Sequence, residues 1–526
     1  MNPILGCHAL RATFLLALTM TGPLLHGQDQ AARALLERHL AWRKDATAAK
    51  VTNLVATARL QAGGLDGTVH VVLARDGRGR EDTVLGLENT AIGSDARGTW
   101  LLNSSGQVGE LAPNESAMRT REQQRRWFGQ WPAEALAQAT TRGQETIEGV
   151  TGEVVVVPLA GGSPVELVLG GDGELLAQRT HRLGIETTIR YGDWRAVGGI
   201  RLPFREQTVG GHDDRLLLWQ TIEAPAAVAD TALQRPLHQA LGSLVIGHDH
   251  ATIPLQASAS GHWFMQVTIA GKQFQALLDT GAGATILDDG TAEQLGVAAA
   301  GEFRSFGAGT KGTAMHHGGA VTVELGDARL PVHTHVSDLS ALGKALMHET
   351  DLIVGHELLL AFTMQLDQKS KTITLADPAQ CKPAAGAVVL PCYSSTGGQV
   401  AVQATVEALP PDWFLVDTGA PPSVLLNGPY VRDHELLADR KGLHDLQLGG
   451  IDGHVPAKIG RLATFTFAGK TRDRTNAIFS CADQGAMAIA EYAGIIGNGI
   501  LQHYRITFDL LGNRMVLEPP AEREDK

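Results

Sequence analysis

The chain has 526 residues, with 44 Lys plus Arg against 56 Asp plus Glu, so its formal net charge is −12. At about 100–200 residues per domain this length predicts about three or four domains, and an acidic balance without a dense Lys/Arg block argues against nucleic-acid binding. The 44% content of hydrophobic residues excludes a chain that is disordered overall, and 61 glycines without a collagen period indicate many tight turns and hence a β-rich protein.

The first segment, residues 1–27, has the features of a signal peptide. Arg11 precedes an apolar run at residues 12–20, and small residues follow near Gly27. A bilayer span needs about 20 apolar residues, which neither this run nor any later stretch supplies. We therefore expect an exported protein, periplasmic or secreted, with no membrane span.

Three cysteines follow this signal. Cys381 and Cys392 lie close together in a stretch rich in Pro and Gly, and Cys481 stands alone. In an oxidising compartment we expect a Cys381–Cys392 disulfide. The spacing matches no zinc pattern.

Residues 28–240 form one compositional unit, interpreted as an N-terminal β-rich domain. Residues 31–60 favour helix, and the short alternating runs beyond them predict strands separated by turns. The predicted strands include residues 68–74, 154–159, 164–169, 175–181 and 216–223. The order predicts a curved antiparallel β-sheet domain with a helix packed on it.

This arrangement loosely resembles the periplasmic lipoprotein-carrier half-barrel. The segments that carry the resemblance are Gly98-Thr99-Trp100, Tyr191-Gly192-Asp193 and Arg201-Leu202-Pro203. No catalytic constellation is evident, so a scaffold role is favoured over docking or binding of an apolar ligand. Residues 236–249, rich in Gly and His, have the composition of a linker.

A duplicated motif dominates the rest of the chain. Asp279-Thr280-Gly281-Ala282 recurs as Asp417-Thr418-Gly419-Ala420, each after an apolar run. Gly355 follows Asp279 by 76 residues and Gly497 follows Asp417 by 80, again within apolar runs. Two copies with matched downstream glycines predict two related lobes, residues 241–380 and 381–526.

The residue types in this motif suit a pair of carboxyl groups. Gly281 and Gly419 permit close backbone approach, and the hydroxyls of Thr280 and Thr418 can cross to the partner loop. Two facing carboxyls share one proton because both cannot ionise at close range. The ionised member can then take a proton from water that attacks a peptide carbonyl, while the protonated member donates to the oxyanion.

Residues 250–517 resemble the retropepsin-like (retroviral-type) aspartic proteases, in the bacterial exported form that carries two lobes in one chain. The resemblance implies a mainly β, bilobal acid-protease architecture with Asp279 and Asp417 as the catalytic pair. It also implies that the runs ending at Gly355 and Gly497 pass behind the two active-site turns. Viral enzymes typically have an acidic residue at the fourth position after the catalytic Asp, paired with an Arg just after the later glycine. Here the first position holds Gly283 in lobe 1 and Pro421 in lobe 2, and the second holds His356 and Asn498. Without this ion pair, a viral-type dimer is not expected.

Two further features concern the activity that the resemblance implies. Ala282 and Ala420 stand where pepsin-like enzymes place a hydroxyl residue, so the pair should hold its proton to higher pH, with activity at mildly acidic to neutral pH. Candidate flaps are two glycine-rich segments, for which an ordinary hairpin turn is an equal alternative. Their glycines are Gly307, Gly309 and Gly312 in lobe 1 and Gly449, Gly450 and Gly453 in lobe 2.

Other polar residues are interpreted as structural. Metal sites need three or four convergent ligands. Because the His316-His317 pair and the His333-x-His335 pair form no complete set, we expect solvated histidines and no metal. Asp367 and Asp509 match between the lobes and are expected to stabilise hairpins.

These observations favour an exported aspartic endopeptidase that acts on a peptide or protein substrate and uses no cofactor. A monomer is favoured, with both lobes in one chain, although pairing of lobes between chains is an alternative. A second alternative is a catalytically inactive peptide- or envelope-binding protein that retains the fold.

Overall fold

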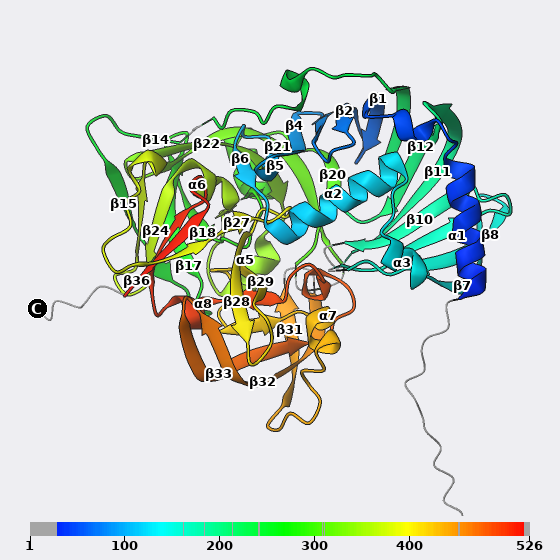
Figure 1. The fold of residues 1–526 in the computed structure, drawn as a ribbon. Helices are drawn as coiled ribbons and strands as arrows, with labels where there is room; N and C mark the ends of the chain where they lie inside the picture. Colours follow the sequence, from blue (N-terminus) through cyan, green and yellow to red (C-terminus); the bar gives the residue numbers. More distant parts are fainter. Residues whose placement is uncertain are drawn as a thin grey trace, which may run out of the picture.

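A computed structural model describes residues 29–519, apart from residues 161, 183–184, 213, 240–241, 308, 310 and 451–452. The predicted signal peptide, residues 1–27, lies outside the described residues. The protein is mainly β, as the sequence predicted, and its strands form four sheets (Figure 1).

The N-terminal domain is built on one 13-stranded antiparallel sheet. Strands β1 to β6 pair in sequence order, as do β7 to β13, and β1 pairs with β13, which gives the order β6-β5-β4-β3-β2-β1-β13-β12-β11-β10-β9-β8-β7. β6 and β7 therefore lie at opposite edges of the sheet. The strands are β1 (Asn53–Ala62), β2 (Leu65–Ala74), β3 (Gly79–Leu85), β4 (Glu88–Asp95), β5 (Gly98–Leu102), β6 (Val108–Glu110), β7 (Thr140–Ile147), β8 (Val150–Val157), β9 (Val165–Leu169), β10 (Leu175–Arg182), β11 (Ile185–Val197), β12 (Ile200–Gly210) and β13 (Arg215–Glu223).

Helices pack on this sheet: α1 (Gln30–Arg43), α2 (Pro113–Phe128) and α3 (Ala133–Ala137). The predicted helical region, residues 31–60, is too long, because α1 ends at Arg43 and burial alternates along most of β1, which is a strand pattern. The Asp29 side chain caps α1 by accepting from the amides of Ala31 and Ala32. In Figure 1, α2 runs between the N-terminal sheet and the remaining sheets.

Lobe 1 contains a nine-stranded sheet and lobe 2 an eight-stranded sheet. The strands of lobe 1 are β14 (Ser243–Leu244), β16 (Gln256–Ala257), β17 (Trp263–Ile269), β18 (Lys272–Leu278), β19 (Thr285–Asp288), β20 (Ala300–Ser305), β21 (Thr313–Leu325), β22 (Ala328–Ser337) and β23 (Leu352–Val354). Those of lobe 2 are β27 (Tyr393–Ser394), β28 (Val400–Val406), β29 (Asp412–Val416), β30 (Val424–Leu426), β31 (His444–Gly450), β32 (Gly453–Phe467), β33 (Lys470–Ser480) and β34 (Gly494–Ile496).

The two lobes repeat the same strand pairings. In lobe 1, β18 runs parallel to β23 and β19 runs parallel to β22. In lobe 2, β29 runs parallel to β34 and β30 runs parallel to β33. The helices of the lobes are short: α4 (Asp289–Leu295), α5 (Ser340–Leu346), α6 (His356–Ala361), α7 (Gly428–Asp433) and α8 (Asn498–Leu501).

A six-stranded sheet joins the lobes, in the order β15-β25-β24-β35-β36-β26. Its two central strands come from different lobes and pair in antiparallel fashion from Met364 opposite Phe508 to Asp367 opposite Arg505. One hydrophobic core continues through both lobes around this sheet. Its strands are β15 (His250–Pro254), β24 (Thr363–Asp367), β25 (Thr372–Ala376), β26 (Val388–Pro391), β35 (Arg505–Asp509) and β36 (Arg514–Glu518).

Asp367 and Asp509 stabilise the two hairpins of this sheet, as the sequence predicted. The Asp367 carboxylate accepts hydrogen bonds from the amides of Lys369 and Ser370. The Asp509 carboxylate accepts from the Gly512 amide and from the Arg514 guanidinium.

The predicted Cys381–Cys392 disulfide is wrong, because both residues are free thiols, as is Cys481. Cys392 is fully buried in the shared core, whereas the half-buried Cys381 thiol interacts with Asp509 and Thr363. Burial raises the pKa of both thiols, which opposes formation of the thiolate that disulfide exchange requires.

No helix within the described part of the chain is long and apolar enough to cross a membrane.

Candidate active site

The two Asp-Thr-Gly turns meet where the two lobes face each other. Asp279 follows β18 and Asp417 follows β29, at equivalent ends of the duplicated strands. The Asp279 amide donates to the Val354 carbonyl at 3.2 Å, and the Asp417 amide donates to the Ile496 carbonyl at 3.1 Å. Each turn is therefore anchored to the strand that runs parallel to its own.

The threonines lock the two turns together through crossed hydrogen bonds. The Thr418 amide donates to Thr280 Oγ1 at 3.0 Å, and the Thr280 amide donates to Thr418 Oγ1 at 3.1 Å. Each hydroxyl then donates to a carbonyl of the opposite strand, Thr280 to Val416 at 3.1 Å and Thr418 to Leu278 at 3.3 Å. These are the cross-loop bonds that the sequence predicted, and they form within a single chain.

The two carboxyl groups lie close together and interact directly. Asp279 Oδ1 also accepts from the Gly281 amide at 2.8 Å, and Asp417 Oδ1 accepts from the Gly419 amide at 2.6 Å. A Cβ at position 281 would lie 2.7 Å from Asp417 Cγ, and one at position 419 would lie 2.9 Å from Asp279 Oδ1. Glycine is therefore required at both turns for the carboxyls to approach.

The pair retains a proton more strongly than a solvated aspartate does. Burial, together with the charge of Asp279, raises the pKa of Asp417 well above its ordinary value, and burial also raises the pKa of Asp279. The amides of Gly281 and Gly419 oppose this effect because they stabilise the ionised forms. Because the two groups interact closely, they titrate as one unit, and the raised pKa belongs to the pair.

Gly355 and Gly497 lie directly behind the turns. A Cβ on Gly355 would lie 2.6 Å from the carbonyl oxygens of both Ala282 and Ala284. One on Gly497 would lie 2.3 Å from the Pro422 carbonyl and 2.4 Å from the Ala420 carbonyl. These contacts with backbone atoms leave no space for a side chain, so both positions require glycine.

The residues after these glycines differ between the lobes. The backbone amides of His356 and Asn498 donate to the carbonyls of Ala282 and Ala420, at 3.0 Å and 2.8 Å. The Asn498 side chain donates to the Thr418 carbonyl at 2.7 Å, whereas the His356 ring lies 2.9 Å from the Ser394 hydroxyl. The Asn498 side chain thus supports the second turn, whereas the matching His356 ring bonds away from the first turn.

The glycine-rich segments are the connections of two hairpins. Gly307, Gly309 and Gly312 lie between β20 and β21, while Gly449, Gly450 and Gly453 close the hairpin of β31 and β32. Gly307 accepts a hydrogen bond from the Ala486 amide of lobe 2 at 3.2 Å, so the first hairpin reaches across to the other lobe. A hairpin at each position is compatible both with a flap and with an ordinary hairpin turn.

His262 lies next to the pair and was missed by sequence reasoning. Its half-buried ring hydrogen-bonds to the Gly419 backbone and is held by the Ser260 hydroxyl at 2.9 Å. Burial lowers the pKa of His262, and the Asp279 charge partly offsets this change. His262 directly precedes β17 and lies outside both copies of the repeated motif, so no sequence pattern identifies it as a site residue.

His317 and His335 are not the solvated histidines that the sequence predicted. Both are half-buried and lie close to Glu88 of the N-terminal domain, in a group whose ligand atoms could hold a metal ion. Glu88 lies 229 residues before His317, so no local sequence pattern associates them.

Comparison with known proteins agrees with this geometry. Residues 265–359, from β17 to α6, match the family described as gag-polyprotein putative aspartyl protease. Lobe 1 contains an aspartyl protease-like domain. The matched part of this domain includes the first Asp-Thr-Gly turn and Gly355, and the repeated strand pairings relate lobe 2 to it.

Two solved structures have a general likeness to the chain. A putative outer membrane lipoprotein-sorting protein domain from Vibrio parahaemolyticus is 9% identical, with a TM-score of 0.27, over 39% of this chain and 96% of that one. A DUF1329 family protein from Desulfovibrio piger is 12% identical, with a TM-score of 0.27, over 39% of this chain and 97% of that one. No curated protein matches the chain.

Proposed function

We propose that this chain is an exported aspartic endopeptidase whose active site is the Asp279/Asp417 pair. The observation that carries the proposal is the close approach of the two carboxyl groups, held by the crossed hydrogen bonds of Thr280 and Thr418. The match of lobe 1 to an aspartyl protease family supports the same reaction class.

The proposed mechanism uses the proton that the pair shares. The ionised carboxylate takes a proton from a bound water, whose oxygen then attacks the carbonyl carbon of the scissile peptide bond. The protonated carboxyl donates to the developing oxyanion. The carboxyl that took the water proton then gives it to the amine nitrogen as the C–N bond breaks, and the other carboxylate regains a proton from a hydroxyl of the tetrahedral intermediate. The raised pKa of Asp417 favours the singly protonated pair at mildly acidic to neutral pH, and no metal or organic cofactor takes part.

The substrate in this proposal is an extended peptide that lies across both turns. The hairpins carrying Gly307 and Gly450 would close over it as flaps and exclude water from the reacting groups. Export by residues 1–27 would place the protein in the periplasm or outside the cell, where it would act as a monomer.

The test is cleavage of a diverse peptide library by residues 28–526 at several pH values between about 4 and 7.5, the range in which a singly protonated pair is expected. We expect cleavage by the parent and none by Asp279→Asn or Asp417→Asn. Asp289→Asn is a matched control, because Asp289 is exposed in the same lobe and should leave activity unchanged.

Equal cleavage by all four proteins would contradict the proposal. A folded parent that binds peptides without cleaving them would instead support the alternative of an inactive peptide-binding protein.

A further inference from the structure

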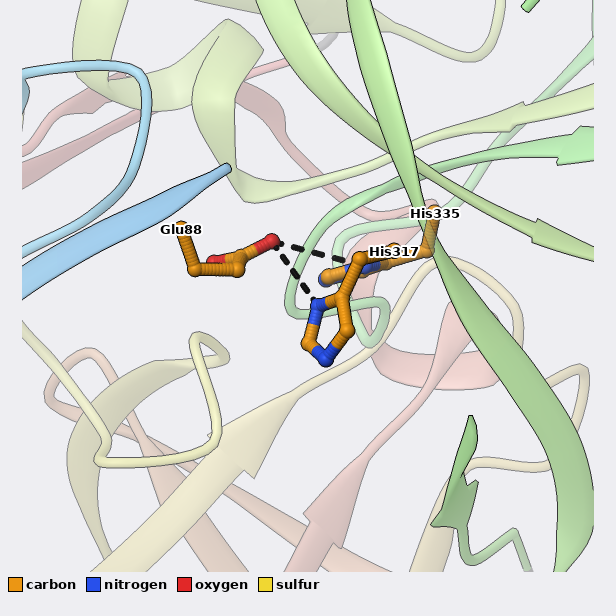
Figure 2. Close-up of side chains that lie close together, drawn as sticks. All are labelled: Glu88, His317 and His335. Atoms are coloured by element: carbon orange, nitrogen blue, oxygen red, sulfur yellow. Dashed lines mark hydrogen bonds and ion pairs between the residues drawn. The ribbon is translucent and has the colours of Figure 1, made fainter. Parts of the chain in front are cut away.

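Glu88, His317 and His335 converge at the contact between the N-terminal domain and lobe 1 (Figure 2). Glu88 begins β4, whereas His317 on β21 and His335 on β22 are directly paired across the two strands. Glu88 Oε1 lies 3.1 Å from His317 Nδ1 and 3.9 Å from His335 Nδ1. Within the group, one ligand atom from each residue lies within 4.8 Å of the others.

Neighbouring residues hold these three side chains in place. The Ser104 hydroxyl donates to Glu88 Oε2, which leaves Oε1 directed at the histidines. The Phe303 ring packs against His317 and His335, with centroid distances of 4.8 Å and 5.0 Å. All three side chains are mostly shielded from water, with exposed fractions of 16% for Glu88, 14% for His317 and 21% for His335.

One ring nitrogen in this cluster lacks a hydrogen bond. His335 Nδ1 is buried and has no hydrogen-bond partner among the described residues, because Glu88 Oε1 is beyond hydrogen-bond distance. A buried nitrogen without a partner is unfavourable unless another species satisfies it. Its lone pair is therefore available in the neutral imidazole that coordinates metals.

The donor set suits a zinc-type ion. Two imidazole nitrogens and one carboxylate oxygen are zinc ligands at about 2.0–2.2 Å, so tetrahedral ligand atoms lie about 3.4 Å apart. The observed separations of 3.1 Å and 3.9 Å fall on either side of this value. Three protein ligands leave a fourth position for water.

We propose that Glu88, His317 and His335 bind one divalent transition-metal ion of the zinc type, which links the N-terminal domain to lobe 1. The ion sits beside the base of the β20–β21 hairpin, whose turn carries Gly307. The N-terminal domain already contacts this hairpin, since the Glu302 amide donates to the Gly63 carbonyl at 2.9 Å and the Arg304 amide donates to the His212 carbonyl at 2.6 Å. Metal binding strengthens this contact and fixes the position of the hairpin relative to the N-terminal domain.

The test is Zn²⁺ binding to untagged residues 28–526, measured by calorimetry after chelator treatment. All proteins carry Cys481→Ser, because the exposed Cys481 thiol is an alternative zinc ligand. We expect one bound Zn²⁺ per chain, with affinity reduced about 100-fold or more by Glu88→Gln or His335→Gln. His316→Gln is the matched control, because His316 is adjacent on β21 but its ring contacts the Gly301 carbonyl instead.

Two further measurements keep the result interpretable if a variant folds poorly. Co²⁺ bound to the protein without Cys481 should give visible absorption of a low-coordinate nitrogen and oxygen site, without a thiolate charge-transfer band. Zn²⁺ should raise the unfolding temperature of the protein with His316→Gln but not that of Glu88→Gln. Absence of Zn²⁺ binding to the parent, or binding that is unchanged in both Glu88→Gln and His335→Gln, would overturn the proposal and leave a Glu88–His317 ion pair.

Discussion

The crossed threonine bonds give a quantitative prediction for Thr418→Val. Valine matches threonine in shape but has no hydroxyl, so the Thr280 amide loses its acceptor and the Leu278 carbonyl loses its donor. Thr280 and Leu278 are 2% and 1% exposed, so water cannot readily replace these bonds. An unsatisfied buried polar group costs about 1–3 kcal/mol, and the two groups together predict a loss of about 2–6 kcal/mol.

Thr418→Ser is the matched control for this change. Serine keeps the hydroxyl and loses only a methyl group at a fully buried position, which costs about 1 kcal/mol. The difference between the valine and serine variants therefore isolates the hydrogen bonds from the packing.

Hydrogen exchange is the appropriate assay, because a chain with several sheets has no single free energy of unfolding. Mass spectrometry of peptides that cover residues 277–282 reports the Thr280 amide directly. We expect its protection to fall at least about tenfold in Thr418→Val and less in Thr418→Ser, since about 1.4 kcal/mol corresponds to a factor of ten. Equal exchange in the two variants would refute the reasoning, because it would mean that the hydroxyl contributes nothing.

Three further predictions concern the carboxyl pair and the thiols. Ala420→Ser adds a donor that favours the ionised pair, so the alkaline limb of the kcat/KM profile should move down by about half to one pH unit; an upward shift would contradict this. The pKa of Asp417 is raised in the folded state, so the folded protein binds this proton more tightly than the unfolded chain does. The stability gained from this difference is complete below the unfolded pKa near 4 and is lost as pH rises through the folded pKa. Asp417→Asn should therefore raise the unfolding temperature at about pH 7 but not at about pH 3.5 in calorimetry, and a decrease at neutral pH would be inconsistent with the raised pKa. Without reductant, a thiol reagent should label Cys481 rapidly in the folded protein and all three thiols of residues 28–526 after unfolding, whereas a Cys381–Cys392 disulfide would leave one reactive thiol in both states.

The parts of the structure that sequence could predict are those encoded locally and repeated. The Asp-Thr-Gly turns carry their geometry in consecutive residues, since Gly281 and Gly419 must be glycine for the carboxyls to approach. Gly355 and Gly497 were identifiable because the duplication repeats them at similar spacing. The repeat thus supplied information that a single copy would not.

The parts that sequence missed depend on contacts between distant segments. Glu88 and His317 belong to different domains, and nothing near either residue indicates that they meet. His262 reaches the active site from outside the repeated motif. The disulfide prediction failed for a related reason, because closeness in sequence did not reveal that Cys392 is enclosed in the core.

The central pairing of β24 with β35 has a consequence for how the two Asp-Thr-Gly turns come together. If the lobes were separate chains, each would expose a strand edge, and assembly of the carboxyl pair would depend on protein concentration. In one chain this step is intramolecular, with an effective concentration set by the connection between β25 and β26. The approach of the two turns should consequently not depend on protein concentration, so the specific activity expected of the pair should remain constant on dilution.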